Sequence, residues 1–278
     1  MKVLELFGGI GACSKALEKL GMDYEIVDYV EIDKHAVASF NAMHETNFEP
    51  QDICKWDKDI EVDLIMHGSP CQDFSLAGLN KGGDKGSGTR SSLMYETIRI
   101  VGKLKPKYVI WENVKNLLSK KHIHNFNSYL EAMEELGYYS YYKVLNAKDY
   151  GIPQNRERIF TISVRKDINK VFTFPQKQEL KLKLKDMLED EVDEKYYLSD
   201  KAINYINDDL PSNYDLSIPI KNATKKGYLD ATDGDSVNLA YPESKTRRGR
   251  VGKQVSQTLQ TSDNMGVVVN DNQRKGNC

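Results

Sequence analysis

The first part of the chain alternates between short apolar runs and segments whose apolar residues recur every three or four positions. Short apolar runs bounded by glycine or charged residues are typical of buried strands, and the longer period is typical of amphipathic helices. Strands that alternate with helices form a mainly parallel sheet with helices on both faces, so we expect an α/β fold. The expected strands are 2–7, 24–33, 62–68, 107–114, 138–147 and 158–166, and the expected helices are 8–21, 34–44, 91–104 and 126–138.

The regular pattern ends near Lys166, where clusters of charged residues and scattered asparagines replace it. We therefore place a domain boundary at about residue 170. A chain of 278 residues is long enough for one large domain and a smaller partner. The expected domains are 1–169, a smaller irregular region at 170–265, and a tail at 266–278.

The formal net charge of −2 excludes a surface uniformly covered by basic residues, so contact with nucleic acid would need a local patch or cleft. The four cysteines, Cys13, Cys54, Cys71 and Cys278, show no C-x-x-C spacing, and no apolar signal segment follows Met1. No stretch approaches the roughly 20 apolar residues that a membrane span needs. We expect a soluble protein of a reducing cytoplasm.

A glycine turn follows the first expected strand. The dinucleotide-binding pattern G-x-G-x-x-G requires a third glycine after Gly9 and Gly11, but this chain has Ser14 at that position. The difference disfavours a dinucleotide cofactor and favours another nucleoside cofactor. Glu31 ends the second strand about 20 residues later, where an acidic side chain typically binds ribose hydroxyls. A solvated strand end is the alternative for Glu31. Asp52, expected to follow a strand, could accept a hydrogen bond from an adenine amino group.

Cys71 follows the apolar run 62–68, and we expect it at the carboxyl edge of the sheet, where open α/β sheets bind their ligands. Pro70 restrains Ser69 to extended geometry, which suits a rigidly held thiol. A free cysteine is also commonly a small buried hydrophobe. The residue types around Cys71 leave both interpretations open.

Two further sets of polar residues are expected near this edge. Glu112 and Asn113 end another apolar strand, and a carboxyl group beside a thiol favours a catalytic role. Gln154, Arg156 and Arg158 alternate at the start of the last expected strand, so they share one face. Two arginines there could bind a carboxylate, a phosphate or a base carbonyl oxygen, with a solvated charged turn as the alternative.

Five blocks of residues, taken in this order, resemble the cytosine-5 DNA methyltransferases. The agreement runs from Lys2 to about Val164, and its proline-cysteine-glutamine and glutamate-asparagine-valine blocks are highly specific. The resemblance implies a Rossmann-like catalytic domain at 1–169 and a target-recognition region at 170–265. The blocks are Phe7-x-Gly9-x-Gly11, Glu31, Gly68-Ser69-Pro70-Cys71-Gln72, Glu112-Asn113-Val114 and Gln154-x-Arg156-x-Arg158.

The resemblance implies a covalent mechanism. Carbon 5 of cytosine is too poor a nucleophile to attack a methyl sulfonium directly, so Cys71 would first add to carbon 6. Glu112 would hold or protonate the ring nitrogen N3, and Arg158 would reach the carbonyl oxygen. Arg156 and Asn113 would organise the pocket, and the target base would have to be flipped out of the duplex.

The implied methyl donor is S-adenosylmethionine, which leaves as S-adenosylhomocysteine. No metal is required, and the five histidines lack ligand spacing. The expected cofactor-binding residues are Phe7, Gly9, Gly11, Glu31, Asp52 and Ile53. The residues expected to contact the substrate are Ser69, Pro70, Gln72, Asn113, Gln154 and Thr258.

Double-stranded DNA is the implied partner, a membrane is not, and the implied location is the cytoplasm of a bacterium or of a phage-infected cell. Residues 77–90 would form a lid over the flipped base, with a flexible connector as the alternative.

Thr258 belongs to a threonine-leucine step that commonly closes the recognition region. A cognate restriction endonuclease is a further partner that the resemblance leaves open. A phosphate-binding patch, with solvated surface as the alternative, would comprise Lys245, Arg247, Arg248, Arg250 and Lys253.

The C-terminal end departs from the family pattern. After "VVVN" the family continues with a helical segment and a glutamine-glycine-asparagine block, of which Gln273, Gly276 and Asn277 keep only a faint trace. The departure leaves three expectations: an active minimal enzyme, a fragment that needs a complementing C-terminal segment, or an inactive DNA-binding relative. A transfer-RNA cytosine methyltransferase is the alternative within the same chemistry.

Overall fold

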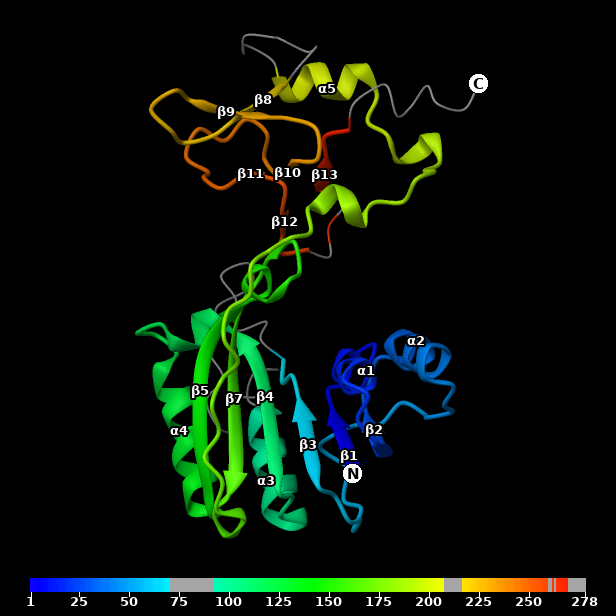
Figure 1. Ribbon diagram of the computed structural model, residues 1–278, viewed down its shortest axis with the longest axis vertical. Helices are drawn as coiled ribbons and strands as arrows, with labels where there is room; N and C mark the ends of the chain where they lie inside the picture. Colours follow the sequence, from blue (N-terminus) through cyan, green and yellow to red (C-terminus); the bar gives the residue numbers. More distant parts are fainter. Residues whose placement is uncertain (71–92, 208–216, 260–261, 263, 270–278) are drawn as a thin grey trace. The chain divides into compact units, whose positions relative to one another are not determined.

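The computed structural model describes residues 1–70, 93–207, 217–259, 262 and 264–269 (Figure 1). Contacts divide the chain into two compact units: the first is Met1–Leu145 with Glu157–Pro175, and the second is Asn146–Arg156 with Gln176–Cys278. The expected domain boundary near residue 170 differs from this division at residues 146–156, which belong to the second unit, and at residues 170–175, which belong to the first. The target-recognition role of 170–265 stays a prediction.

A six-stranded sheet forms the centre of the first unit, in the order β2-β1-β3-β4-β7-β5 (Figure 1). β1 pairs in parallel with β2 and with β3, β3 pairs in parallel with β4, and β7 runs antiparallel to β4. The expected α/β fold with a mainly parallel sheet is confirmed. The strands are β1 (Lys2–Leu6), β2 (Glu25–Val30), β3 (Leu64–His67), β4 (Tyr108–Val114), β5 (Tyr138–Asn146) and β7 (Glu157–Arg165).

Helices cover both faces of this sheet. Leu4 and Ile65 are fully buried in the core cluster that includes residues of α3 and α4, whereas Val3 and Leu64 pack with Leu17 of α1. Neighbouring residues of one strand therefore face different helices, as the period of a strand requires. Within the part of the chain that the structure describes, no helix is long and apolar enough for a membrane crossing. The helices are α1 (Ala12–Lys19), α2 (Lys34–His44), α3 (Met94–Leu104) and α4 (Ile123–Glu135).

The parallel strands all end at one edge of the sheet. In the register of the sheet, Leu6 lies opposite Val30 on one side and His67 on the other, and His67 lies opposite Trp111. The segments that follow β1, β2 and β3, and the end of β4, therefore emerge side by side. These segments carry most of the residues that the sequence predicts for the site, and ligands of open α/β sheets bind at this edge.

Asp52, in the connection from α2 to β3, is expected to follow a strand, and the structure differs. No strand precedes Asp52 in residues 45–51, all of which the structure describes. Instead Asp52 lies in a turn, in which the Gln51 N–H donates to the Glu31 carbonyl at 2.8 Å and the Lys55 N–H donates to the Asp52 carbonyl at 3.0 Å. The turn is thus attached to the residue that follows β2.

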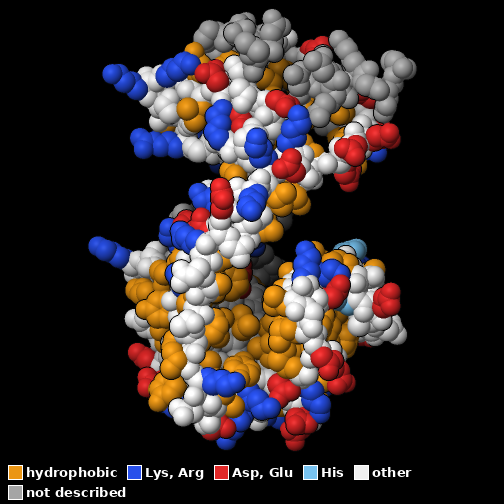
Figure 2. Space-filling view, in the orientation of Figure 1, with side chains coloured by type: hydrophobic (Ala, Val, Ile, Leu, Met, Phe, Trp, Pro, Cys, Tyr) orange, Lys and Arg blue, Asp and Glu red, His pale blue; other side chains and the backbone are white. Residues whose placement is uncertain are grey.

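The face of the sheet that α1 covers carries half-buried apolar residues on β4 and β7. Ile110 and Glu112 of β4 lie opposite Ile162 and Phe160 of β7, and all four are partly exposed. Figure 2 shows hydrophobic side chains gathered on this side of the first unit. Glu112 therefore stands at the carboxyl end of a partly covered apolar surface.

In its described residues, the second unit consists of short strands, one helix and several single turns. β10 pairs with β11 and β13, β8 pairs with β9, and β6 pairs with β12. Because β13 pairs with β10, residues 265–267 belong to this unit, whereas the expected tail begins at residue 266. The elements are β6 (Gln154–Asn155), α5 (Asp200–Asn207), β8 (Ile218–Lys221), β9 (Tyr228–Ala231), β10 (Ser236–Asn238), β11 (Val251–Gly252), β12 (Ser256–Gln257) and β13 (Met265–Val267). Turns of 3-10 helix lie at Lys115–Leu118, Ala147–Tyr150, Lys166–Ile168, Leu184–Met187 and Glu194–Tyr196.

Arg250 is buried inside the second unit, with 2% of its surface exposed. Its guanidinium donates to four backbone carbonyls at 3.1 to 3.2 Å. These contacts hold the loop between β10 and β11 and leave Arg250 unavailable to a phosphate, contrary to its expected place in the patch. The four carbonyls belong to Lys221, Asn238, Ala240 and Pro242.

Asp235 is the second buried charge of this unit. Its carboxylate accepts hydrogen bonds from the Thr232 N–H at 2.8 Å and the Gln254 N–H at 3.0 Å, and it forms an ion pair with Lys253 at 2.7 Å. Burial by itself would raise the pKa of Asp235, but these partners lower it to about 2. Lys253 of the expected patch is therefore paired within the protein.

We expect the Asp235 carboxylate to make the stability of the protein depend on pH between about 4 and 2. The carboxyl group titrates near 3.8 when unfolded and near 2 when folded, so its contribution is complete above the unfolded pKa and is lost as the pH falls through the folded one. This contribution is about 2 kcal/mol. Urea unfolding across this pH range should show a shallower pH dependence for Asp235→Asn than for the wild type and for the exposed control Asp190→Asn. Equal pH dependence in all three would contradict the assignment.

Candidate active site

The turn between β1 and α1 adopts left-handed backbone geometry at Phe7, Gly9 and Gly11, with φ of 54°, 54° and 84°. A Cβ added at Gly11 would lie 2.3 Å from His44 Nε2 and 2.7 Å from Phe40 Cδ2, so α1 can pack against α2 only if this residue is glycine. A Cβ added at Gly9 would meet no atom within 4 Å. The turn thus leaves open space at Gly9, near the amino end of α1, where a ligand can approach the backbone.

Glu31 directly follows β2 and closes this turn. Its Oε2 accepts a hydrogen bond from the Gly9 N–H at 3.2 Å. Its Oε1 accepts from the N–H groups of Ile32 at 2.8 Å and Asp33 at 2.9 Å. The structure therefore brings two of the expected cofactor-binding residues, Gly9 and Glu31, into direct contact.

Glu5 on β1 is a buried carboxyl group that is not among the site residues expected from the sequence. It is 1% exposed, and the backbone N–H and the hydroxyl of Ser14 donate to its Oε1. Burial raises the pKa of Glu5. Its buried Oε2 has no hydrogen-bond partner among the described residues and would lie 3.1 Å from a Cβ added at Gly8. The available signal was a charged residue between Leu4 and Leu6, inside an otherwise apolar strand.

The segment 51–58 is tied to β2 through Asp28, which is 3% exposed. Asp28 accepts hydrogen bonds from Gln51 Nε2 at 2.8 Å and Trp56 Nε1 at 2.7 Å, and it forms an ion pair with Lys58 at 2.8 Å. Burial by itself would raise the pKa of Asp28, but these partners hold it below its usual value. The resulting network fixes both ends of the segment that carries Asp52 and Ile53.

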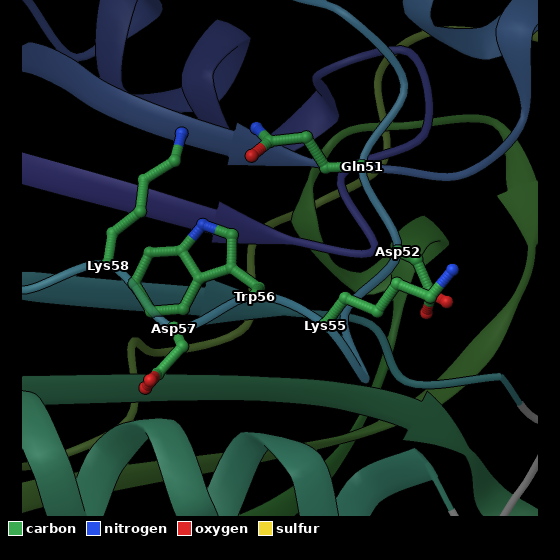
Figure 3. Close-up of a pocket in the computed structure, with 6 residues that line it drawn as sticks. All are labelled: Gln51, Asp52, Lys55, Trp56, Asp57 and Lys58. Carbon is green, nitrogen blue, oxygen red and sulfur yellow. The ribbon is translucent and has the colours of Figure 1, made fainter.

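Asp52 is half-buried and accepts a hydrogen bond from the Cys54 N–H at 3.0 Å, while Ile53 is 5% exposed. A depression of about 240 Å³ lies beside them, and Figure 3 shows Asp52 and Lys55 on one side of it and Trp56 on the other. Because charged side chains form most of its lining, this depression alone does not outline an adenine site. It is lined by Gln51, Asp52, Lys55, Trp56, Asp57 and Lys58.

Glu112 and Arg158 form an ion pair between β4 and β7. Arg158 Nε lies 3.0 Å from Glu112 Oε1, and the two side chains are 16% and 32% exposed respectively. Their shared face follows from the antiparallel register, in which Val114 lies opposite Arg158. A Cβ added at Gly68, just after β3, would lie 3.9 Å from Glu112 Oε2. Two expected catalytic residues and the chain that leads toward Cys71 therefore meet at the edge of the sheet.

Ser69 and Asn113 meet in the interior of the first unit, with exposures of 3% and 1%. Asn113 Nδ2 donates to the Ser69 carbonyl at 3.3 Å, and Trp111 Nε1 donates to Ser69 Oγ at 3.0 Å. Pro70 directly follows and is the last described residue before 93. Cys71, Gln72 and the expected lid at 77–90 lie outside the described residues, and their roles stay predictions.

Gln154, Arg156 and Thr258 lie in the second unit, whereas Arg158 lies in the first. β6 pairs in parallel with β12, and the Gln154 side chain donates to a carbonyl of β12 at 3.5 Å. Thr258 Oγ1 donates to the Asn155 carbonyl at 3.0 Å. The structure thus brings Gln154 and Thr258 together and places the two expected catalytic arginines in different units.

Cys13 and His67 are uncharged neighbours of this edge. Burial raises the pKa of Cys13 to about 12, and the charges of Glu5 and Glu112 add to this effect. Burial lowers the pKa of His67 to about 3, so its ring is neutral near pH 7. Among the described residues, no group of three or more His, Cys, Asp or Glu side chains could hold a metal ion. The described site therefore offers carboxyl groups, a guanidinium and backbone N–H groups.

Comparison with known proteins gives consistent matches. A model of the C-5 cytosine-specific DNA methylase family matches residues 1–276. The type II methyltransferase M2.ScrFI of Lactococcus lactis subsp. cremoris is 36% identical over 73% of this chain and 72% of its own length. The orphan methyltransferase M.SPRI of Bacillus phage SPR is 33% identical over 98% of this chain and 73% of its own. A solved structure described as a putative DNA modification methyltransferase encoded within an E. coli prophage has a TM-score of 0.56 and 26% identity, over 72% of this chain and 56% of that one.

We expect Gly11→Ala to lower the free energy of unfolding more than Gly9→Ala does. Both alanines would have to adopt left-handed backbone geometry, at about 1–2 kcal/mol each. At Gly11 the added Cβ would also collide with Phe40 and His44, which should add about 1–3 kcal/mol. Urea unfolding of the full chain measures both losses, and equal losses would show that Gly11 does not have this packing role.

Proposed function

The chain belongs to the C-5 cytosine-specific DNA methylase family, and we propose that it transfers a methyl group from S-adenosylmethionine to carbon 5 of a cytosine in double-stranded DNA. The observation that carries this proposal is the Glu112–Arg158 ion pair, which lies beside Gly68 and the chain that leads to Cys71. A carboxyl group and a guanidinium held together suit the ring nitrogen N3 and the adjacent carbonyl oxygen of a pyrimidine.

Cys71 is the nucleophile of the proposed reaction. Its thiolate forms a bond to carbon 6 of the flipped-out cytosine, and carbon 5 thereby gains nucleophilic character. Glu112 holds or protonates N3 and offsets the charge that develops during the addition, while Arg158 reaches the adjacent carbonyl oxygen of the base. When bound, S-adenosylmethionine supplies an electrophilic methyl group at carbon 5. Loss of the proton from carbon 5 and cleavage of the bond to Cys71 restore the ring double bond and the free thiolate.

The described residues fit S-adenosylmethionine. The open space at Gly9 admits a ligand close to the backbone, and the Glu31 carboxylate beside it can accept hydrogen bonds from ribose hydroxyls. The unpartnered Oε2 of Glu5 lies beneath the same turn and can receive a further donor. The residues proposed to hold the cofactor are Phe7, Gly9, Gly11, Glu31, Asp52 and Ile53.

The second unit is proposed to bind the DNA, and Lys245 and Arg248 support this role. Both are exposed, and within the described part of the chain neither has an ion-pair partner. They lie in the loop between β10 and β11, which the buried Arg250 holds through four carbonyls, and Arg247 of the same loop stacks over Tyr241 at 5.2 Å. A held loop with free cations suits a phosphate backbone.

A companion restriction endonuclease is a further proposed partner. The name of the type II relative M2.ScrFI supports it, whereas the name of the orphan methyltransferase of phage SPR supports a chain that acts alone. Co-purification of an endonuclease that cuts only unmethylated copies of the same DNA sequence would decide between the two.

Covalent trapping tests the proposed chemistry. With S-adenosylmethionine, a pool of random-sequence duplexes that contain 5-fluorocytosine should form a stable adduct with the protein, because fluorine at carbon 5 blocks the final elimination. Cys71→Ser should abolish the adduct, and Glu112→Gln should slow its formation by about 100-fold or more. The exposed Cys54 provides the matched control, and Cys54→Ser should leave the adduct unchanged.

Two results would overturn the proposed function. Binding of duplex DNA without any adduct would leave an inactive DNA-binding relative, or a fragment that requires a complementing segment. Methylation of transfer RNA in place of duplex DNA would show that the chain acts as a transfer-RNA cytosine methyltransferase.

Replacement of Arg248 tests the proposed DNA contact. Arg248→Gln should weaken binding to all duplex sequences to a similar degree and should reduce the slope of log affinity against log salt by about 1. The control Lys2→Gln also removes one positive charge. Lys2 lies at the start of β1, and the candidate site lies at the end of that strand, so this variant should leave the slope unchanged. A salt dependence of Arg248→Gln equal to that of the wild type would exclude a phosphate contact.

A further inference from the structure

Ser69 is held by the two residues of β4 that flank Glu112. Trp111 Nε1 donates to Ser69 Oγ at 3.0 Å, and Asn113 Nδ2 donates to the Ser69 carbonyl at 3.3 Å. Ser69, Trp111 and Asn113 are all buried, with exposures of 3%, 1% and 1%. Side chains this deeply buried and bonded to one another are poorly placed for contact with a base, although Ser69 and Asn113 are expected to contact substrate.

The alternation of β4 separates these anchors from the acid. Trp111 and Asn113 lie on the face of the sheet that is buried under α3 and α4, and Glu112 lies on the opposite face with its ion-pair partner Arg158. One strand therefore carries the Glu112 carboxyl group and also holds the backbone at Ser69, two residues before Cys71. A movement of Ser69 relative to β4 would move the start of the chain that leads to Cys71 relative to Glu112.

The direction of the Trp111 N–H bond is fixed by aromatic packing. The indole stacks on His67, with ring centroids 5.7 Å apart and an angle of 6° between the rings, and its centroid lies 4.1 Å from that of Tyr129. His67 Nε2 and Tyr129 Oη form a hydrogen bond of 3.2 Å in the same cluster. Close-packed side chains cannot rotate without opening the core. The Trp111 Nε1–H group therefore stays directed at Ser69 Oγ.

We propose that the Trp111–Ser69 hydrogen bond positions the Cys71 thiol for attack on the pyrimidine, and that it sets the rate of covalent addition without changing the affinity for DNA or cofactor. This proposal rests on the proposed function, in which Cys71 is the nucleophile. Pro70 restrains Ser69 to extended geometry, so the anchor is connected to Cys71 through a stiff segment. A displacement of about 1 Å at a reacting atom can cost about 100-fold in rate.

The test is the single-turnover rate of adduct formation with the 5-fluorocytosine duplex pool and S-adenosylmethionine. Ser69→Ala removes the acceptor, and Trp111→Phe removes the donor while it keeps an aromatic ring. Each variant should form the adduct about tenfold or more slowly. The double variant should be no slower than the slower single variant, because both changes remove the same bond. The affinities for the duplex pool and for S-adenosylmethionine should remain those of the wild type.

Ser163→Ala is the matched control. Ser163 on β7 is also fully buried, and its hydroxyl forms a 2.8 Å hydrogen bond with that of Ser140, but in the register it lies opposite Val109, away from Glu112. This variant should lose stability comparably to Ser69→Ala and should keep the wild-type adduct rate.

The outcomes separate the two proposals. If the wild type forms the adduct and Ser69→Ala and Trp111→Phe form it equally fast, positioning by this bond is excluded and the proposed function stands. A slower rate accompanied by equal losses of affinity, or an equal slowing in Ser163→Ala, would also exclude it, since general destabilisation would then explain the effect. If the wild type forms no adduct, the proposed function fails, and the positioning role fails with it. Should Trp111→Phe not fold, Ser69→Ala alone decides.

Discussion

Parallel pairing of β1 with β2 and β3, and of β3 with β4, is the constraint on which the candidate site depends. It brings the ends of four strands to one edge, with Leu6 opposite both Val30 and His67. The glycine turn, the Glu31 carboxylate and the chain that leads through Ser69 and Pro70 all begin there. Residues far apart in the sequence thus become neighbours, and the Gly9–Glu31 hydrogen bond is a direct consequence. A one-residue change in register would turn the side chains of a strand to the other face and dismantle this arrangement.

β4 has two roles that its alternating side chains separate. On one face Glu112 pairs with Arg158 at 3.0 Å, partly exposed to solvent, and on the other Trp111 and Asn113 are buried and hold Ser69. A reactive group needs access to its substrate, and its support needs burial to remain rigid. A strand satisfies both requirements within three consecutive residues, which a helix, with its longer period, does not.

The second unit uses part of its positive charge internally. Arg250 and Lys253 both lie near the loop between β10 and β11, but Arg250 binds four backbone carbonyls and Lys253 pairs with the buried Asp235. Small units with short strands bury little apolar surface, so buried and fully bonded charges can fix their loops instead. The cations that remain exposed, Lys245 and Arg248, are then presented on a loop of defined shape.

The sequence by itself determined the strands and helices of the first unit, the family, and the candidate roles of Glu31, Glu112 and Arg158. Hydrophobic periodicity and the order of motif blocks are local properties of the chain, and the rule that strand ends meet at one edge extends them to the site. Only the tertiary structure decided which of the similar cations at 245–253 are free, and that the segment 146–156 packs with the second unit. It alone paired Glu5 with Ser14 and Trp111 with Ser69, which lies 42 residues away in the chain. Burial and hydrogen bonding at these positions depend on which distant segments pack together, and no local pattern encodes that choice.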